Sequence, residues 1–186
     1  MRIFYDTEFL EDGRHIELIS IGMVAEDGRE YYAVNRDMPK RKIRKHKWLM
    51  ENVVPSLPHA HGDERNMQIG WLFNPFDRRV KGKDQIANEV ADFILGPGHR
   101  SSSELPHVEL WAWYGAYDHV ALAQLWGPMI NLPEGIPMWT NDLRQECERL
   151  GVAKSMPEQP DGVHNALADA RHNLVRARYL DELARA

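Results

Sequence analysis

A short turn signal between two strand-like segments constrains the fold of this chain more than any other feature of its sequence. Residues 17–24 and 30–34 are rich in β-branched and aromatic side chains, and Asp27-Gly28 lies between them. An Asp-Gly pair between two such segments is typical of a tight β-hairpin turn. A further strand is predicted over residues 2–5, so the first three strands are expected to form an antiparallel meander.

The rest of the chain alternates between helical and extended patterns. A basic segment, residues 40–52, is predicted to be helical, and residues 55–82 are predicted to form a loop. Further helices are expected over residues 84–95, 118–126, 141–150 and 165–184, with extended segments at 108–113 and 136–139. A hairpin-led mixed sheet with crossover helices predicts an α/β fold. Because no glycine-rich phosphate loop follows the first strand, the pattern favours a ribonuclease H-like mixed sheet over a Rossmann sheet. That arrangement has an antiparallel three-strand meander plus parallel strands, flanked by helices.

Length and composition limit the number of domains and the cellular setting. With 186 residues, 43% hydrophobic and 27% charged, the chain is expected to form a single domain over residues 1–186. Its apolar runs fall well short of the roughly 20 residues that cross a bilayer, and Asp6 interrupts the first of them, so neither a membrane span nor a signal peptide is expected. A single cysteine, Cys147, allows no internal disulfide and is typical of the cytoplasm, where we expect the protein to be.

Charge is distributed unevenly along the chain. A formal net charge of -5 argues against a protein that grips nucleic acid with a uniformly positive surface, but not against a nuclease whose carboxylates hold metal ions. Between residues 36 and 47, seven lysines and arginines stand against one acid, Asp37. Apolar Ile43, Trp48 and Leu49 at helical spacing favour a helix with its lysines in solvent. The alternative is a track for the phosphates of RNA.

Two acids after the first predicted strand are the first candidates for chemistry. Asp6 and Glu8 are two residues apart, so on a strand both leave the same face, ~6.6 Å apart along the backbone, which allows both to bind one metal ion. Asp118 follows the fourth predicted strand in the same way, so the acids at two neighbouring strand ends are expected to converge. The competing interpretation of Asp6 and Glu8 is a solvated strand end.

A histidine and an acid near the start of the last predicted helix complete the candidate site. Residues five apart are about 140° out of line on a helix, so His164 and Asp169 cannot both be helical and face one site. His164 is therefore expected on the loop before the helix, where Gly162 favours a mobile approach and a base can close onto substrate. Asp169 and His172, three apart on one helical face, form a rival pair that would suit zinc, although no further ligand is spaced to complete that site.

Three motifs, in this order, resemble those of a nuclease superfamily. Asp6-Thr7-Glu8-Phe9, the Tyr-Gly-Ala-Tyr-Asp sequence of residues 114–118, and His164-x4-Asp169 are similar to the motifs of the DEDDh 3′-to-5′ exonucleases of the ribonuclease T type. The resemblance implies two Mg²⁺ or Mn²⁺ ions, with Asp6 bridging them and Glu8, Asp118 and Asp169 completing their shells. It also implies that His164 deprotonates the attacking water. Two divalent ions suit phosphodiester hydrolysis because they activate water and offset charge on the leaving oxygen.

The second motif carries a finer resemblance. Residues 113–118 are similar to the Trp-Tyr-Gly-Ala-Tyr-Asp sequence of mycobacterial polyadenylate-specific members of this superfamily. That resemblance implies an exoribonuclease that acts on RNA 3′ ends, prefers adenylate tracts and works as a homodimer. It implies that Phe9 and Leu10 close over the terminal nucleotide and that Tyr114 and Tyr117 contact substrate, with a core aromatic as the alternative for Phe9. A DNA proofreading-type exonuclease and a catalytically silent RNA-binding module are the alternative functions.

Overall fold

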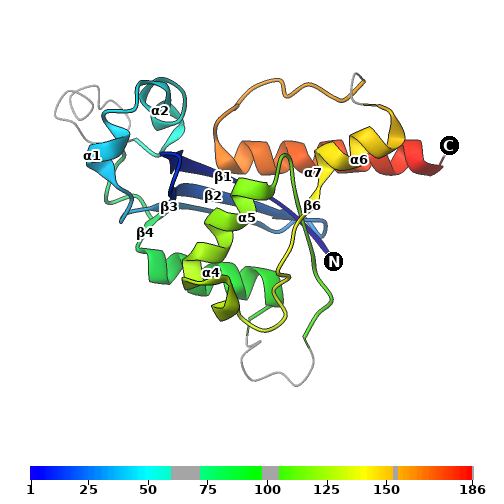
Figure 1. Ribbon diagram of the computed structural model, residues 1–186, viewed down its shortest axis with the longest axis horizontal. Helices are drawn as coiled ribbons and strands as arrows, with labels where there is room; N and C mark the ends of the chain where they lie inside the picture. The colour runs from blue at the N-terminus through cyan, green and yellow to red at the C-terminus, as the bar shows by residue number, and fades with distance from the viewer. Residues whose placement is uncertain (60–71, 98–104, 153–154, 186) are drawn as a thin grey trace.

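A six-stranded mixed sheet forms the centre of the molecule (Figure 1). The computed structural model describes residues 1–59, 72–97, 105–152 and 155–185. Strands β1 (Arg2–Glu11), β2 (Ile16–Ala25) and β3 (Glu30–Asn35) form the predicted antiparallel meander, with the β2–β3 turn at Asp27-Gly28. Three short strands extend the sheet in parallel pairings: β4 (Val80–Lys81) beside β3, β5 (Glu109–Ala112) beside β1, and β6 (Asn141–Asp142) beside β5. The order β4-β3-β2-β1-β5-β6 is consistent with the expected ribonuclease H-like fold.

Helices cover both faces of this sheet (Figure 1). The long helix α7 (Ala166–Arg185) and α6 (Leu143–Leu150) lie on one face, where Phe4 of β1 packs against Cys147 and Leu180. Helices α4 (Lys83–Leu95) and α5 (Ala116–Ala123) lie on the other, where Tyr5 joins a core with Ile86. Side chains of β1 therefore alternate between the α7 face and the α4–α5 face, as the pleat of a strand requires.

A close contact at Gly22 brings the start of α7 onto the middle of the sheet. A Cβ atom at Gly22 would lie 2.3 Å from backbone atoms of Ala166 and Leu167, so only glycine allows α7 to pack this tightly. Gly22 is also the register partner of Asp6 on β1. The first turn of α7, which carries Asp169, is thereby held close to Asp6.

Several predicted boundaries are wrong. Strand β1 continues to Glu11 because it stays paired with β2 as far as Ile16, so Asp6 and Glu8 lie within the strand and not beyond its end. The predicted helix over 40–52 is two short helices, α1 (Lys40–Ile43) and α2 (Lys47–Asn52). The break follows a run of like charges, which destabilise a helix, and the His46 side chain caps α2 by accepting from the Leu49 amide.

Other differences concern short elements. The predicted loop over 55–82 contains β4, and its residues 60–71 lie outside the described part of the chain. Residues 136–139 form no strand; the extended pairing comes later, in β6, directly before α6. Three 3₁₀ turns complete the described elements: η1 (Val54–Ser56), η3 (Gln124–Trp126) and η4 (Met129–Asn131). Within the described ranges, the structure has no helix with the length and apolar character needed to cross a membrane.

Candidate active site

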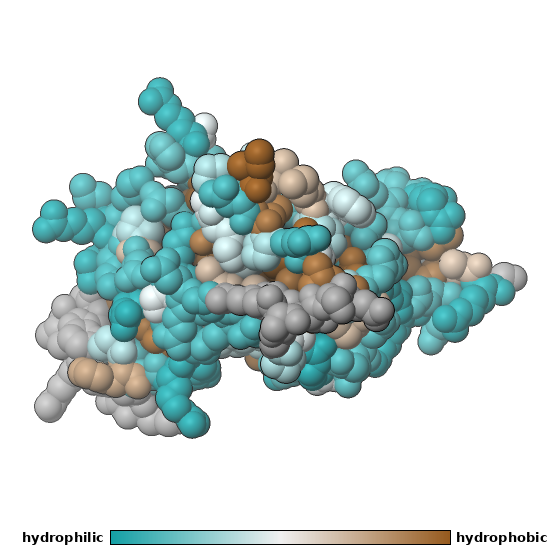
Figure 2. Space-filling view, turned by 90° about the horizontal axis from the view of Figure 1, so that it is seen from below, coloured by the Kyte–Doolittle hydropathy of each residue, from teal (hydrophilic) through white to brown (hydrophobic). Residues whose placement is uncertain are grey.

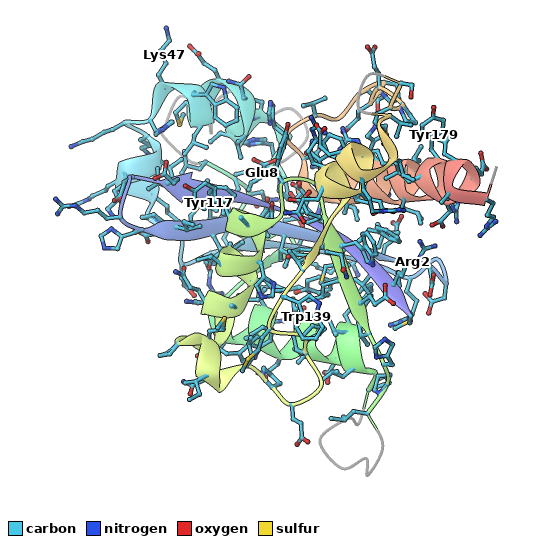
Figure 3. The ribbon with its side chains drawn as sticks, turned by 45° about the vertical axis from the view of Figure 1, so that its right-hand side comes forward. Arg2, Glu8, Lys47, Tyr117, Trp139 and Tyr179 are labelled. Carbon is cyan, nitrogen blue, oxygen red and sulfur yellow. The ribbon has the colours of Figure 1, made fainter. Side chains whose placement is uncertain are left out.

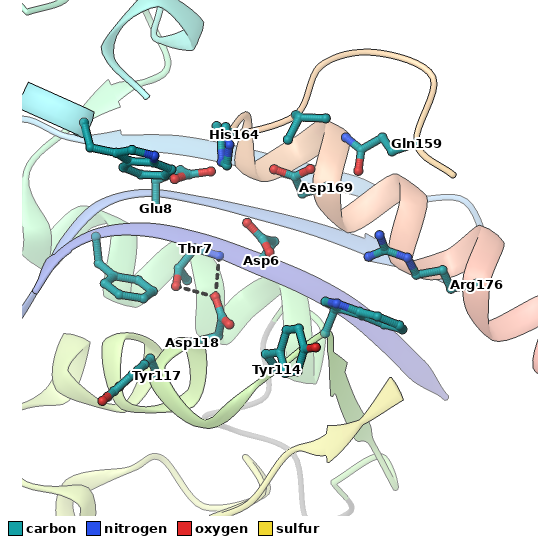
Figure 4. A pocket seen from close by; sticks show the side chains of 14 residues that line it. Asp6, Thr7, Glu8, Tyr114, Tyr117, Asp118, Gln159, His164, Asp169 and Arg176 are labelled. Atoms are coloured by element: carbon teal, nitrogen blue, oxygen red, sulfur yellow. Dashed lines mark hydrogen bonds between the residues drawn. The ribbon is translucent and has the colours of Figure 1, made fainter. Parts of the chain in front are cut away.

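A pocket of about 490 Å³ opens between β1, α5 and the start of α7 (Figure 4). Four stretches that are distant in the sequence line it: β1, helix α2, the β5–α5 junction, and the segment that leads into α7 together with α7 itself. All five residues predicted to be catalytic are at this pocket. They are Asp6, Glu8, Asp118, His164 and Asp169.

Three of these carboxylates form a tight group. Oxygen atoms of Asp6, Glu8 and Asp169 all lie within 4.8 Å of one another. Asp6 and Glu8 leave the same face of β1, as their spacing predicts, and this is the face that α7 covers with Asp169 in its first turn. The competing interpretation, a solvated strand end, is wrong for Glu8, which is only 8% exposed.

Burial and mutual repulsion make this group costly while it is ionised. Burial, together with the charges of Asp169 and Asp118, raises the pKa of Glu8 to about 8. Burial and the neighbouring carboxylates likewise raise the pKa of Asp6 well above its usual value. A divalent cation among these oxygens would offset the repulsion, and hard carboxylate ligands suit Mg²⁺ or Mn²⁺. The donor set therefore fits such an ion.

Asp118 reaches the pocket from the opposite side of β1. It lies on α5, and its Oδ1 accepts two hydrogen bonds from Thr7, 2.8 Å from the backbone amide and 2.6 Å from the hydroxyl (Figure 4). Burial raises the pKa of Asp118 to about 6, and the bonds from Thr7 oppose that rise. The structure thus brings Asp118 to the predicted site, where Thr7 holds its side chain. Asp118 is not part of the group of three carboxylates that lie within 4.8 Å of one another.

His164 precedes α7, as the spacing to Asp169 predicts. Its backbone has a φ of 66°, in the left-handed region, and Gly162 two residues earlier has a φ of 69°. The imidazole packs edge-on against Trp48 of α2, with ring centroids 4.8 Å apart. The carbonyl oxygen of His164 accepts a 2.6 Å hydrogen bond from Ser56. These contacts fix the loop at the rim of the pocket.

The rival histidine has a structural position. His172 is buried on α7, and its Nε2 lies 3.0 Å from the carbonyl oxygen of Pro157, within hydrogen-bonding distance. Burial lowers the pKa of His172. Its side chain is not among the described residues that line the pocket. The pairing of Asp169 with His172 as zinc ligands therefore has no support in this geometry.

Of the residues predicted to bind substrate, three line the pocket and one does not. Phe9 lies 6.0 Å from Tyr117, measured between ring centroids, and Tyr114 is largely exposed at the pocket edge. Leu10 is only 4% exposed and packs in the core beside Ile19, below α1 and α2. The register of β1 against β2 shifts between Glu8 and Phe9, so both of these neighbours line the pocket, whereas Leu10 turns to the core. The prediction that Phe9 and Leu10 close together over a nucleotide conflicts with this arrangement.

Helix α2 contributes its single aromatic residue, Trp48, to the site, and its lysine points away from it. Ile43 and Leu49 are buried as predicted, but Trp48 is half exposed and lines the pocket. Lys47, at the start of α2, points away from Glu8 into solvent (Figure 3). Lys42 of α1 pairs with Asp12 and Glu17, the latter at 2.9 Å.

Sequence reasoning missed several pocket residues. Arg176 lies seven residues after Asp169, about two helical turns along the same face of α7, so helical spacing alone could have identified it. Trp113 precedes the second motif directly, and Gln159 lies in the polar loop before α7. No periodic signal marks Gln159, because a loop residue is placed by tertiary contacts.

Comparison with known proteins assigns the chain to a family. The profile of the Rv2179c-like 3′–5′ exoribonuclease domain matches residues 1–180, a stretch that contains every pocket residue described above. Two proteins from strains of Mycobacterium tuberculosis, the 3′–5′ exoribonucleases Rv2179c and MT2234.1, are each 46% identical to this chain over 180 residues. The similarity covers 97% of this chain and 93% of each relative. The chain therefore belongs to the Rv2179c-like 3′–5′ exoribonuclease family.

Proposed function

We propose that this protein hydrolyses RNA from its 3′ end and releases nucleoside 5′-monophosphates. The observation that carries the proposal is the group of Asp6, Glu8 and Asp169, with oxygens within 4.8 Å of one another, in a pocket with His164 at its rim. The M. tuberculosis relatives are named 3′–5′ exoribonucleases, which supports the same reaction here. The motif order supports placement among the DEDDh exonucleases.

Two Mg²⁺ or Mn²⁺ ions complete the proposed site. Asp6, Glu8, Asp118 and Asp169 are the protein residues that would hold them, and the resemblance of the motifs gives Asp6 the shared position. Such ions lower the pKa of water and offset the charge that develops on a leaving oxygen. The protein contributes rigid ligands: β1 fixes Asp6 and Glu8, Thr7 fixes Asp118, and the contact at Gly22 fixes the start of α7.

His164 is the proposed general base. A water oxygen attacks the phosphorus of the last phosphodiester while the imidazole takes one proton of that water. The bond from phosphorus to the 3′ oxygen of the preceding nucleotide breaks, and that oxygen takes a proton from solvent. The products are one nucleoside 5′-monophosphate and an RNA shorter by one nucleotide with a free 3′ hydroxyl.

The aromatic residues near Glu8 suit the terminal nucleotide. The ring of Phe9, supported by Tyr117, offers a surface on which a base can stack. Glu8 is placed to accept a hydrogen bond from the terminal ribose, and the 2′ hydroxyl is the group that separates RNA from DNA. Tyr114, 63% exposed, is the further candidate for substrate contact. Stacking tolerates any base, so the proposed preference for adenylate rests on the resemblance of the second motif.

We further propose a cytoplasmic homodimer in which residues 1–186 act as one exonuclease domain. The single, buried Cys147 supports a reducing compartment. Large apolar side chains are exposed in η4 and after it, among them Ile130 at 83% and Trp139 at 66%. Figure 2 shows hydrophobic side chains gathered at one part of an otherwise hydrophilic face. A second copy of the chain would cover such a surface.

Homopolymer assays test the substrate. The protein is incubated with 5′-labelled A, C, G and U RNA homopolymers and with DNA of matching length, with Mg²⁺ and with EDTA. We expect Mg²⁺-dependent shortening from the 3′ end, faster on RNA than on DNA and fastest on oligoadenylate. Equal rates on all four RNAs would refute the adenylate preference. Faster DNA hydrolysis would favour a proofreading-type enzyme, and binding without hydrolysis would favour a silent RNA-binding module.

A further inference from the structure

One arginine lies in the candidate active site beside the carboxylates. Arg176 of α7 lines the pocket and is about half buried. Among the pocket residues that the structure describes, it is the one with a lysine or arginine side chain. Figure 4 shows its guanidinium directed toward Asp6, on the side of Asp6 away from Glu8. A permanent positive charge is thus built into an otherwise acidic site.

The arginine is held in a defined orientation. Its Cζ atom lies 4.2 Å from the centroid of the Trp113 ring, so the guanidinium rests on an aromatic face. Its Nη1 donates a 3.0 Å hydrogen bond to Oδ1 of Asn173, and the amide of Asn173 donates in turn to the carbonyl oxygen of Tyr5 in β1. Trp113 and Asn173 therefore fix the side chain relative to the strand that carries Asp6.

This orientation leaves most of the hydrogen-bonding capacity of Arg176 unused. A guanidinium has five N–H donors in a planar fork, and within the described ranges Arg176 makes one hydrogen bond, to Asn173. Its Nε is buried and has no partner among the described residues. Among the described residues, no carboxylate oxygen lies within 4.0 Å of an Arg176 nitrogen as an ion pair. Arg176 therefore acts on these acids through its charge, which opposes the rise in the pKa of Asp6 and Asp169, and its N–H groups stay available for a ligand.

We propose that Arg176 binds a non-bridging oxygen of the scissile phosphodiester, an inference that rests on the proposed RNA hydrolysis. The terminal base is proposed to stack on Phe9, beside Tyr117 and Glu8. The phosphate on the 5′ side of that nucleotide then lies over the carboxylates, at the end of the pocket that Arg176 occupies (Figure 4). A planar guanidinium matches two phosphate oxygens, which a lysine does not. Trp113 then serves as the platform that keeps the fork in place before RNA arrives.

Binding measurements on a slow background test this role. The His164→Ala protein is mixed with Mg²⁺ and a 5′-fluorescein-labelled oligoadenylate, and anisotropy gives the dissociation constant over a range of salt. Arg176→Gln is expected to weaken binding by about ten-fold and to reduce the slope of log affinity against log salt by about 0.7, the value of one phosphate contact on a single strand. Arg176→Lys is expected to keep the slope but recover only part of the affinity.

Arg178→Gln is the matched control. Arg178 is two residues further along α7 and exposed, so the substitution removes the same charge from the same helix away from the pocket. It is expected to leave both affinity and slope close to those of the His164→Ala parent. If Arg176→Gln binds RNA as the parent does and instead only weakens Mg²⁺ binding, Arg176 acts on the carboxylates and the proposal is overturned.

The outcome separates this inference from the proposed function. If the protein with His164 intact shortens RNA and Arg176→Gln leaves affinity and slope unchanged, the phosphate role fails and the exoribonuclease activity stands. If the protein neither binds nor shortens RNA, both are refuted. Far-ultraviolet circular dichroism and the melting temperature of each variant test whether the fold is retained.

Discussion

The hydroxyl of Ser56 donates a 2.6 Å hydrogen bond to the carbonyl oxygen of His164. The side chain of Asn165 donates back to the carbonyl oxygen of Ser56 at 3.1 Å, so the two segments are joined in both directions. His164 needs this support because its φ of 66° costs a non-glycine residue roughly 1 kcal/mol. The η1 turn that follows α2 thereby holds the loop that presents the proposed general base.

Ser56→Ala is expected to slow turnover without weakening RNA binding. Loss of the bond frees the His164 loop, so kcat should fall by about three- to ten-fold while KM stays within about two-fold, as expected when positioning is disturbed and binding is not. Steady-state release of mononucleotides from oligoadenylate measures both constants. Ser155→Ala is the control, because the Ser155 hydroxyl donates to the carbonyl oxygen of Val152, at the α6 end of the segment that leads to His164. An unchanged kcat in Ser56→Ala would show that this bond does not position His164.

His164→Ala is expected to lower turnover, whereas His172→Ala is expected to lower stability. Loss of the proposed general base should slow turnover by about 10² to 10⁴ while RNA binding is retained. His172 is bonded to Pro157 and buried, so His172→Ala should lower thermal stability and leave the remaining folded enzyme active. Turnover per folded molecule, with melting temperatures measured alongside, distinguishes the two. A larger loss of turnover in His172→Ala would reverse the assignment.

Metal-free protein is expected to lose stability as pH rises from about 4.5 toward 8. The pKa of Glu8 is raised from 4.5 to about 8 by burial and by the Asp169 and Asp118 charges. The unfolded chain therefore releases this proton first, so the contribution of Glu8 to stability is fully present below pH 4.5 and is lost as pH rises through the folded value. Thermal melts in EDTA between pH 5 and pH 8 measure this loss of stability, which should appear as a falling melting temperature.

The Asp6→Asn protein provides the comparison for these melts. Removing one of the crowded charges relieves repulsion, so its melting temperature in EDTA should equal or exceed that of the unsubstituted protein at neutral pH. Mg²⁺ should raise the melting temperature of the unsubstituted protein more than that of Asp6→Asn. A clear fall in stability for Asp6→Asn in EDTA would contradict the repulsive character of the group.

Phe9→Ala and Leu10→Ala should separate substrate binding from stability. Phe9 lines the pocket, so its truncation should raise KM for RNA with little change in melting temperature. Leu10 is buried beside Ile19, so its truncation should reduce the free energy of unfolding by about 2 to 4 kcal/mol. Denaturant titration and steady-state kinetics on both proteins give the comparison. Equal KM effects would place Leu10 at the substrate after all.

The sequence predicted the parts of the fold that local signals determine. The β2–β3 hairpin follows from Asp27-Gly28, and α4 and α7 follow from apolar periodicity. The two-residue strands β4 and β6 escaped prediction because they exist only through pairing with β3 and β5, which lie far away in the sequence. Helix propensity could not locate the break between α1 and α2, which depends on the cap at His46.

The candidate site was predictable where spacing determines geometry. The same-face rule for Asp6 and Glu8 and the loop position of His164 both agree with the structure. Strict alternation from Asp6 and Glu8 would have put Leu10 on their face and Phe9 on the other. The register shift between Glu8 and Phe9 reverses this, and spacing alone does not mark it. The hydrogen bonds from Thr7 to Asp118 and the orientation of Arg176 on Trp113 depend on packing between distant segments, which spacing alone does not reveal.

A gel assay shows whether this protein removes nucleotides from RNA 3′ ends and whether that reaction needs the Asp6 carboxylate. A 5′-labelled oligoadenylate is incubated with Mg²⁺ and either the unsubstituted protein or Asp6→Asn, and the products are resolved at single-nucleotide resolution. We expect a ladder that shortens one nucleotide at a time from the 3′ end with the unsubstituted protein, and intact RNA with Asp6→Asn. Equal shortening by both proteins, or no shortening by either, would contradict it.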